Sequence, residues 1–434
     1  TVLGLWNDLA QIKAGNDLLT SREGVYEEIL DAVNAGTLKI TDINRSVLNI
    51  LKTTVQTPQF KGNDFSYHPD LDSIQGIKHQ VSTEGIVLLK NENQALPLTK
   101  EGNQIAIYGE HSSHIAAGLD SLGYNYSLNT DVIPSQSILN QQVRNANAAL
   151  ITIRRNFFET DEYELTLTKS ELSMIQSVCR TYQSANKKVV VILDIDTPLE
   201  TASWKNLPDA ILLTCTTWER DGSAIADIIS GRINPSGKLT FTFPEKYTDI
   251  PSAEDMINES AENNITYTED IYVGYRYFDT FRKNVSYPFG FGLSYTTFKY
   301  SDATILQEGD NYEVTVTITN TGKYAGKEVV QLYVSAPITP DFPKPLKELK
   351  AFAKTKTLAL GESEIVTMRV NQMDLTSFDE STSSWMAESG TYRFLIGSSS
   401  QDIKQMVSVE IPQSIEKKVA NVLLPRQPVN ILTP

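Results

Sequence analysis

Apolar residues recur at helical spacing through residues 1–56, in three runs that end near Ala14, Gly36 and Leu51. A period of 3.6 residues predicts amphipathic helices, because side chains three and four positions apart share one face. No strand accompanies these helices, so we expect their apolar faces to need a partner beyond this segment. Residues 57–75 follow as a polar stretch with prolines and a glycine, which predicts a linker.

Residues 76–245 alternate short apolar runs with helical patterns. Buried strands are predicted where the apolar runs lie, at residues 105–108, 149–153, 189–195 and 210–215. The helical pattern that ends at Ser184 opens with Thr168-Lys-Ser-Glu171, the signature of a capping box. This alternation predicts an α/β sandwich, in which a mostly parallel, doubly wound sheet has flanking helices. In such sheets the functional groups lie in loops after the carboxyl ends of strands.

A different pattern occupies the last part of the chain. Residues 246–297 are rich in Tyr, Gly and Pro, and predict a long connecting segment whose aromatic side chains pack across other surfaces. Over residues 298–412 apolar and polar residues alternate with a period of two, as in the run from Tyr312 to Thr319. Roughly six or seven such strands predict an all-β, immunoglobulin-like sandwich. Residues 413–434 are expected to form a C-terminal tail.

The composition narrows the class of protein. The 434 residues carry a formal net charge of -15. This charge argues against nucleic acid or an anionic membrane surface as partner, since both attract basic patches, and it is compatible with a neutral sugar. No run of about twenty apolar residues occurs, so we expect no membrane-spanning helix. We therefore expect a soluble protein, and the sequence leaves its compartment open between a bacterial cytoplasm and secretion.

The cysteines and histidines point to no metal site. Cys179 lies in a helical pattern and Cys215 in an apolar run, so two buried free thiols are favoured over a disulfide, which stays as the alternative. No zinc-ligand spacing occurs, and the four histidines are scattered. We expect neither a metal nor an organic cofactor.

One predicted loop carries candidate chemistry. The strand that ends at Ile153 runs into a charged loop in which Glu159 follows Phe157 and Phe158. Partial desolvation by these rings would raise the pKa of the Glu159 carboxyl and make it a proton donor near neutral pH. From spacing alone, a solvated acidic loop is the favoured alternative.

A second predicted loop covers Ala116 to Tyr124, where Asp120 would bind a substrate hydroxyl and the glycines would permit sharp turns. An ordinary flexible loop is the alternative, and no phosphate-binding Gly-x-x-x-x-Gly-Lys pattern is present. The absence of a Gly-x-Ser-x-Gly sequence argues against a Ser-His-Asp hydrolase.

A specific resemblance rests on motifs spread along nearly the whole chain. They are Lys13-Ala-Gly-Asn-Asp-Leu-Leu19, Glu84-Gly-Ile-Val-Leu-Leu-Lys-Asn91, Gly231-Arg-Ile-Asn-Pro-Ser-Gly-Lys-Leu239, Tyr272-Val-Gly-Tyr-Arg-Tyr-Phe278, Tyr287-Pro-Phe-Gly-Phe-Gly-Leu-Ser-Tyr-Thr-Thr-Phe298 and Gly322-Lys-Tyr-Ala-Gly-Lys-Glu-Val-Val-Gln-Leu-Tyr-Val334. In this order they resemble the carboxyl-terminal portion of β-glucosidase-like family 3 glycoside hydrolases. The resemblance implies a helical remnant of the (β/α)8 barrel over residues 1–56, the α/β sandwich domain over 76–245 and a fibronectin type III-like domain over 298–412.

The resemblance also implies an activity and a role for Glu159. Family members are retaining β-glycosidases that use two carboxylates in a double displacement. Their acid/base Glu lies in a loop resembling Arg-x-x-Gly-Glu-Gly-x-Asp-Arg, onto which Arg155 and Glu159 fall. The chain departs from this motif at Phe158 and Thr160, where the family has glycines, and at Glu162-Tyr163. A non-catalytic carbohydrate-binding or assembly module of the same descent is therefore the alternative.

No nucleophile is identified in this chain. The family places an Asp in a Thr-Asp-Trp strand end of the barrel, a few residues before the segment that resembles Lys13 to Leu19. Asp8 is the nearest carboxylate, but its surroundings do not match, and a loop or helix-cap role is favoured. We expect the chain alone to be incomplete, with a β-linked oligosaccharide or glycoside as substrate and a separate barrel chain as a candidate partner.

Overall fold

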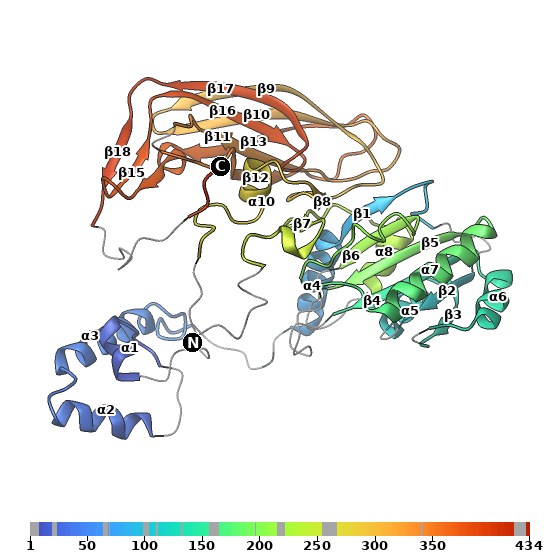
Figure 1. Cartoon of the computed structure of the whole chain (residues 1–434), viewed down its shortest axis with the longest axis horizontal. Coiled ribbons are helices and arrows are strands. Elements are labelled where there is room, and N and C mark those ends of the chain that lie inside the picture. Colours follow the sequence, from blue (N-terminus) through green and yellow to red (C-terminus); the bar gives the residue numbers. More distant parts are fainter. Residues whose placement is uncertain are drawn as a thin grey trace. The chain divides into compact units, whose positions relative to one another are not determined.

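The computed structural model describes residues 8–19, 24–63, 68, 70–98, 104–109, 112–131, 133–155, 165–195, 197–214, 222–253, 267–339, 342–420 and 431–434 (Figure 1). The chain divides into two compact units, residues 1–74 and 75–434. Each unit has its own buried core.

The first unit is helical, as the spacing of apolar residues predicts. Its helices are α1 (Asp8–Ala14), α2 (Val25–Asn34) and α3 (Ile40–Thr54). Ile12, Ala32 and Leu38 form its small core. Leu48 and Leu51 of α3 remain 52% and 53% exposed, so the three helices do not bury their own apolar faces.

A six-stranded sheet forms the centre of the α/β part, and helix α4 (Leu71–Gly85) leads into it. The strands are β1 (Val87–Asn91), β2 (Gln104–Tyr108), β3 (Asn125–Asn129), β4 (Ala148–Arg154), β5 (Lys188–Asp194) and β6 (Ala210–Thr214). Their order is β1-β6-β5-β4-β2-β3, and β1 pairs antiparallel with β6 while the other pairs are parallel. The prediction of a mostly parallel sheet is confirmed.

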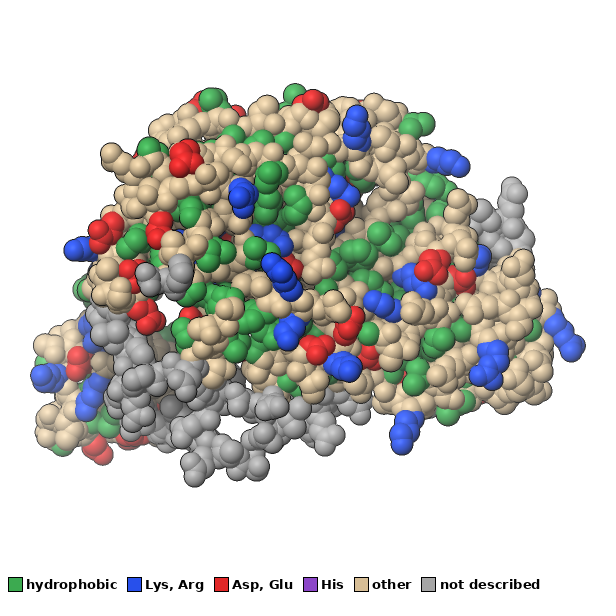
Figure 2. All heavy atoms as spheres, turned by 45° about the horizontal axis from the view of Figure 1, so that its top comes forward, with side chains coloured by type: hydrophobic (Ala, Val, Ile, Leu, Met, Phe, Trp, Pro, Cys, Tyr) green, Lys and Arg blue, Asp and Glu red, His purple; other side chains and the backbone are tan. Residues whose placement is uncertain are grey.

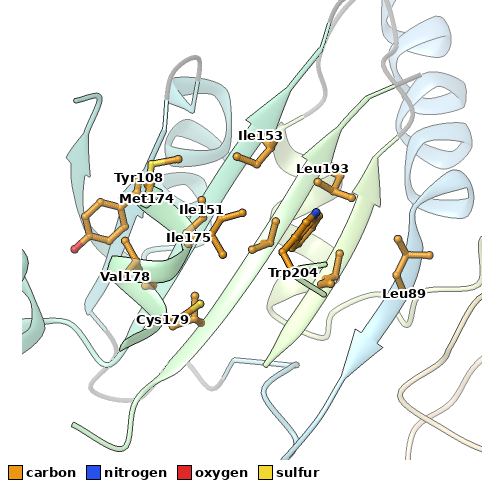
Figure 3. Close-up of a cluster of buried hydrophobic side chains, with 14 of the residues drawn as sticks. Leu89, Tyr108, Ile151, Ile153, Met174, Ile175, Val178, Cys179, Leu193 and Trp204 are labelled. Atoms are coloured by element: carbon orange, nitrogen blue, oxygen red, sulfur yellow. The ribbon is translucent and has the colours of Figure 1, made fainter. Parts of the chain in front are cut away.

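Helices cover both faces of this sheet. Helices α5 (Ser113–Ser121) and α8 (Gly222–Ile229) pack on one face, and α6 (Gln136–Asn145) and α7 (Lys169–Ser184) on the other. Alternate strand residues enter the two cores, so the strands read as continuous apolar runs. Figure 3 shows Met174, Ile175 and Val178 of α7 against Ile151 and Ile153 of β4.

The connecting segment contains short elements of its own. They are β7 (Phe243–Pro244), the 3-10 helix η1 (Tyr247–Asp249), α10 (Tyr275–Thr280) and β8 (Val285–Tyr287). Strand β7 pairs with β8. Tyr275 stacks on Phe289 with ring centroids 4.6 Å apart and meets the edge of Tyr333 in the following domain. The prediction that these aromatics pack across other surfaces is confirmed.

The last part is an all-β sandwich, as the period of two predicts. Its strands are β9 (Phe298–Glu308), β10 (Asn311–Asn320), β11 (Val329–Ser335), β12 (Glu348–Lys354), β13 (Ser363–Asn371), β14 (Ser377–Asp379), β15 (Ser384–Ala387), β16 (Gly390–Gly397), β17 (Ile403–Ile411) and β18 (Ile415–Lys418). A short 3-10 helix, η2 (Gln372–Leu375), follows β13. The sheets β13-β10-β9 and β12-β11-β16-β17 enclose one core between them.

The described surface mixes charges of both signs. Figure 2 shows acidic and basic side chains interspersed on one face, with hydrophobic side chains between them. Within the described ranges, no helix is long and apolar enough to cross a membrane.

Candidate active site

The predicted catalytic loop leaves the sheet at the end of β4. This strand lies between β2 and β5, and its last residue, Arg154, pairs with Asp194 at the end of β5. The N–H of Arg155 donates to the carbonyl oxygen of Asp194 at 3.2 Å. The chain therefore departs from the carboxyl edge of the sheet at Arg155, where parallel α/β sheets place their functional groups.

The side chain of Arg155 is held by a carboxylate on the next helix. Its Nη1 and Nη2 donate to Oε1 and Oε2 of Glu171 at 2.5 and 2.6 Å. These two parallel bonds form the bidentate arrangement that suits guanidinium and carboxylate. The two side chains are 12% and 19% exposed, so water screens the ion pair only weakly.

Glu171 also completes the predicted capping box of α7, which is confirmed. The Glu171 N–H donates to Thr168 Oγ1 at 3.2 Å, and the Thr168 N–H donates to Glu171 Oε2 at 2.8 Å. Burial favours a raised pKa for the Glu171 carboxyl, but the hydrogen bonds from Arg155 and Thr168 outweigh it and lower that pKa. The charged form of Glu171 is thus the stable one.

Glu159 itself falls in residues 156–164, outside the described ranges, so its acid/base role stays a prediction. The structure describes the chain again from Leu165, directly after this segment. The Leu165 carbonyl oxygen accepts from the Glu200 N–H at 2.6 Å. The Thr166 carbonyl oxygen accepts from Arg155 Nη2 at 3.4 Å. Both ends of the segment are therefore tied to the carboxyl edge of the sheet.

A cavity of about 210 Å³ lies where this segment returns. Its lining is mostly apolar and comes from three stretches of chain: Leu165, Thr197, Pro198, Leu199, Glu200, Pro244, Tyr247 and Ile250. The carboxylate of Glu200 accepts hydrogen bonds from Ser203. Sequence reasoning missed this cavity, because its walls are far apart along the chain.

The prediction of a second loop from Ala116 to Tyr124 is wrong, because residues 113–121 form helix α5. Ile115 and Leu119 of this helix are fully buried against the sheet. Asp120 is exposed and lies near the helix C-terminus. Since α5 follows β2 and precedes the parallel strand β3, its last turn approaches the amino edge of the sheet. The hydroxyl-binding role of Asp120 stays a prediction, and this placement argues against it.

The structure also describes two other residues that the sequence analysis considered, Asp8 and Cys179. Asp8 lies buried in the first turn of α1, and its Oδ1 accepts from Gln11 Nε2 at 3.4 Å. Cys179 is a buried free thiol on α7, while Cys215 falls outside the described ranges. Among the residues that the structure describes, no His, Cys, Asp and Glu side chains gather in a group that would hold a metal ion.

Comparison with known domains identifies the two parts of the second unit. Residues 86–295 match the glycosyl hydrolase family 3 C-terminal domain, and residues 328–400 match a fibronectin type III-like domain. The chain belongs to glycosyl hydrolase family 3. These matches confirm the family that the sequence motifs resemble. They also confirm the predicted fold class, an α/β sandwich followed by an all-β sandwich.

Relatives within the family span more than this chain. This chain is 32% identical to the thermostable beta-glucosidase B of Acetivibrio thermocellus. The matched region covers 95% of this chain and 58% of that protein. The chain is 30% identical to an exo-alpha-(1->6)-L-arabinopyranosidase of Bifidobacterium breve, covering 93% of this chain and 57% of that one. The structure of beta-glucosidase 3B from Thermotoga neapolitana in complex with glucose has a TM-score of 0.86 and 34% identity, over 95% of this chain and 66% of that chain. The chain thus spans about three fifths of the curated relatives and about two thirds of the solved structure.

Proposed function

We propose that this chain supplies the acid/base half of a retaining β-glycosidase, with Glu159 as the proton-transferring carboxylate. In this reaction one carboxylate attacks the anomeric carbon, and the other protonates the leaving oxygen and then deprotonates the water that releases the sugar. The substrate is a β-linked oligosaccharide or glycoside. Relatives of nearly equal identity carry the names of a beta-glucosidase and an arabinopyranosidase, so the sugar itself is left to experiment.

One observation carries the proposal. The segment that contains Glu159 begins directly after Arg155, at the carboxyl end of a strand flanked by β2 and β5. Its far end returns to the same edge at Leu165, which the Glu200 N–H binds. Parallel α/β sheets carry their functional groups at this edge, which supports a catalytic role for a carboxylate of the segment that joins these two points.

We further propose that the nucleophile comes from a (β/α)8 barrel. The relatives are single chains that extend beyond the region matched here. Such a barrel belongs either to the same polypeptide or to a separate chain, and it would place the attacking carboxylate about 5 Å from the acid/base group, as retention requires. The chain without the barrel would then have no glycosidase activity.

The test is hydrolysis of a panel of aryl β-glycosides by the chain alone and by the chain combined with a family 3 barrel domain. Glu159→Gln is compared with Glu162→Gln, a neighbouring carboxylate of the same loop. We expect activity in the combined form, a loss of roughly 100-fold or more in Glu159→Gln and little change in Glu162→Gln. Azide should restore turnover of Glu159→Ala, because this small anion attacks the glycosyl-enzyme without general-base help and occupies the space that the carboxylate leaves.

Other results would redirect the assignment. A loss confined to Glu162→Gln would move the acid/base role to that residue. Retention of specific sugar binding by a folded chain, with no hydrolysis in either form, would favour the non-catalytic module suggested by Phe158 and Thr160. Activity from the chain alone would contradict the assignment of the nucleophile to the barrel.

A further inference from the structure

We propose that the Arg155–Glu171 ion pair positions the acid/base carboxylate by fixing the two ends of the segment that carries it. Arg155 immediately precedes residues 156–164, and Glu171 lies on the helix that follows them. We propose no contact of Arg155 or Glu171 with the substrate, so both are positioning residues. The inference rests on the proposed role of Glu159.

The pair joins backbone on both sides of the segment. On the upstream side, Arg155 Nη1 also donates to the carbonyl oxygen of Arg154 at 2.9 Å. On the downstream side, Nη2 donates to the carbonyl oxygen of Thr166 at 3.4 Å. A single guanidinium therefore contacts the strand end, the returning chain and helix α7 at once. Arg suits this task because its planar fork has five donors in fixed directions.

Helix capping alone does not account for the pair. The cap uses the Glu171 N–H, Thr168 and one carboxylate oxygen, Oε2. The other oxygen, Oε1, accepts from Arg155 Nη1 at 2.5 Å. The capping box would be complete without Arg155, so the arginine adds a link from α7 to the backbone on either side of residues 156–164.

The expected consequence is geometric. General acid catalysis requires the proton donor to stand within hydrogen-bond reach of the leaving oxygen. A displacement of about 1 Å of a catalytic group costs up to roughly 100-fold in rate. Loosening the base of the loop should therefore weaken proton donation while leaving sugar binding and nucleophilic attack in place.

The first test compares leaving groups in the active form, the chain combined with its barrel. A dinitrophenyl group departs without a proton, whereas an alkyl or sugar leaving group needs one. We expect Arg155→Lys and Glu171→Gln to lower kcat/KM by roughly 10- to 100-fold for the alkyl glycoside and by less than about 3-fold for the dinitrophenyl glycoside. A uniform loss for both substrates would overturn the proposal, because a merely structural role affects every substrate alike.

A matched control comes from the sandwich domain. Arg369 also binds a glutamate with two donors, Nε and Nη2 to Glu313 Oε2 at 2.9 and 2.7 Å, but its side chain is 72% exposed. Arg369→Lys should leave both kcat/KM values unchanged. The Glu159→Gln variant serves as the reference for the leaving-group effect. If it shows no such effect, the proposed function fails, whatever the ion-pair variants do.

The second test needs no activity. Amide hydrogen exchange is measured in the chain alone for peptides that cover residues 156–164 and for peptides of α7. We expect Arg155→Lys and Glu171→Gln to speed exchange of the loop by about tenfold, and Arg369→Lys to change nothing. Unchanged loop exchange in Arg155→Lys would overturn the proposal, as would an effect of Glu171→Gln confined to the first turn of α7.

Discussion

The carboxylate of Glu84, at the end of helix α4, lies 2.8 Å from the ammonium group of Lys354 on strand β12. Lys327 donates to the other carboxylate oxygen at 2.6 Å. Next to this cluster, Lys238 pairs with Glu328 at 2.9 Å. All three ion pairs join the α/β domain to the fibronectin type III-like domain. Ion pairs rather than apolar packing therefore form one part of the junction between the two family domains.

We predict that low pH destabilises this junction, because the Glu84 carboxylate becomes protonated and loses its ion pairs. Burial favours a raised pKa for its carboxyl, but hydrogen bonds from Lys327 and Lys354 outweigh it and lower the pKa to about 2 from 4.5. A carboxyl whose pKa is depressed on folding stabilises the protein above its unfolded pKa, and this stabilisation disappears as the pH falls from about 4.5 towards 2. Such a shift corresponds to about 3 kcal/mol, which partial exposure of the pair reduces to roughly 1–2 kcal/mol.

The measurement is the free energy of unfolding of Glu84→Gln from pH 7 to pH 3. The variant should lose about 1–2 kcal/mol at pH 7 and approach the parent protein at low pH. Glu362→Gln is the control, since Glu362 pairs with Lys356 at 2.8 Å on the exposed surface of the sandwich. A constant difference between Glu84→Gln and the parent at every pH would contradict the assignment of the titration to Glu84.

The layout of the sheet was predictable from sequence, whereas parts of the site were not. Strands β4 and β5 are buried on both faces, so their residues form continuous apolar runs that stand out in the sequence between the helical patterns. The sequence predicts a loop where α5 lies, because Gly118 and Gly123 suggest turns. The first of these glycines packs against α8, about one hundred residues later in the chain, and that contact leaves no local signal.

The Arg155–Glu171 pair illustrates a second limit. The sequence predicts Glu171 as the last residue of a capping box, which explains the glutamate fully at the local level. Its contact with Arg155 depends on where a parallel strand ends relative to the following helix. That relationship is tertiary, so a single sequence does not reveal it.

We predict that Gly118→Ala destabilises the packing of α5 on α8. A Cβ atom at residue 118 would collide with the carbonyl oxygen of Gly222, which opens α8. Backbone cannot move aside as a flexible side chain can, so we expect a loss of about 1–3 kcal/mol in the free energy of unfolding. Chemical denaturation measures this loss.

Gly76→Ala is the matched control for this substitution. Gly76 lies in helix α4, and a Cβ atom there meets no atom within 4 Å. Alanine is the better helix former, so this variant should gain up to about 1 kcal/mol. Equal effects of the two substitutions would show that helix propensity, and not the approach of α5 to α8, decides the outcome.

Gln331 of β11 connects three segments through one buried amide. Its Nε2 donates to the carbonyl oxygens of Gly290 and Ser398 at 3.0 and 2.7 Å, and its Oε1 accepts from the Tyr333 hydroxyl at 2.6 Å. Gly290 belongs to the connecting segment, and Ser398 follows β16 of the sandwich. The amide thus ties the connecting segment to the fibronectin type III-like domain.

We predict that Gln331→Met costs about 3 kcal/mol of unfolding free energy. Methionine retains the length of the side chain but leaves the buried Gly290 carbonyl oxygen, the part-buried Ser398 carbonyl oxygen and the Tyr333 hydroxyl without this partner. Each unsatisfied buried group costs about 1–3 kcal/mol. Gln405→Met is the control, because Gln405 makes a single bond of 3.1 Å to the Tyr300 carbonyl oxygen from a half-buried position, and about 1 kcal/mol is expected. Denaturant unfolding of both variants gives the comparison. Equal losses would mean that the three hydrogen bonds of Gln331 stabilise the fold no more than the single hydrogen bond of Gln405 does.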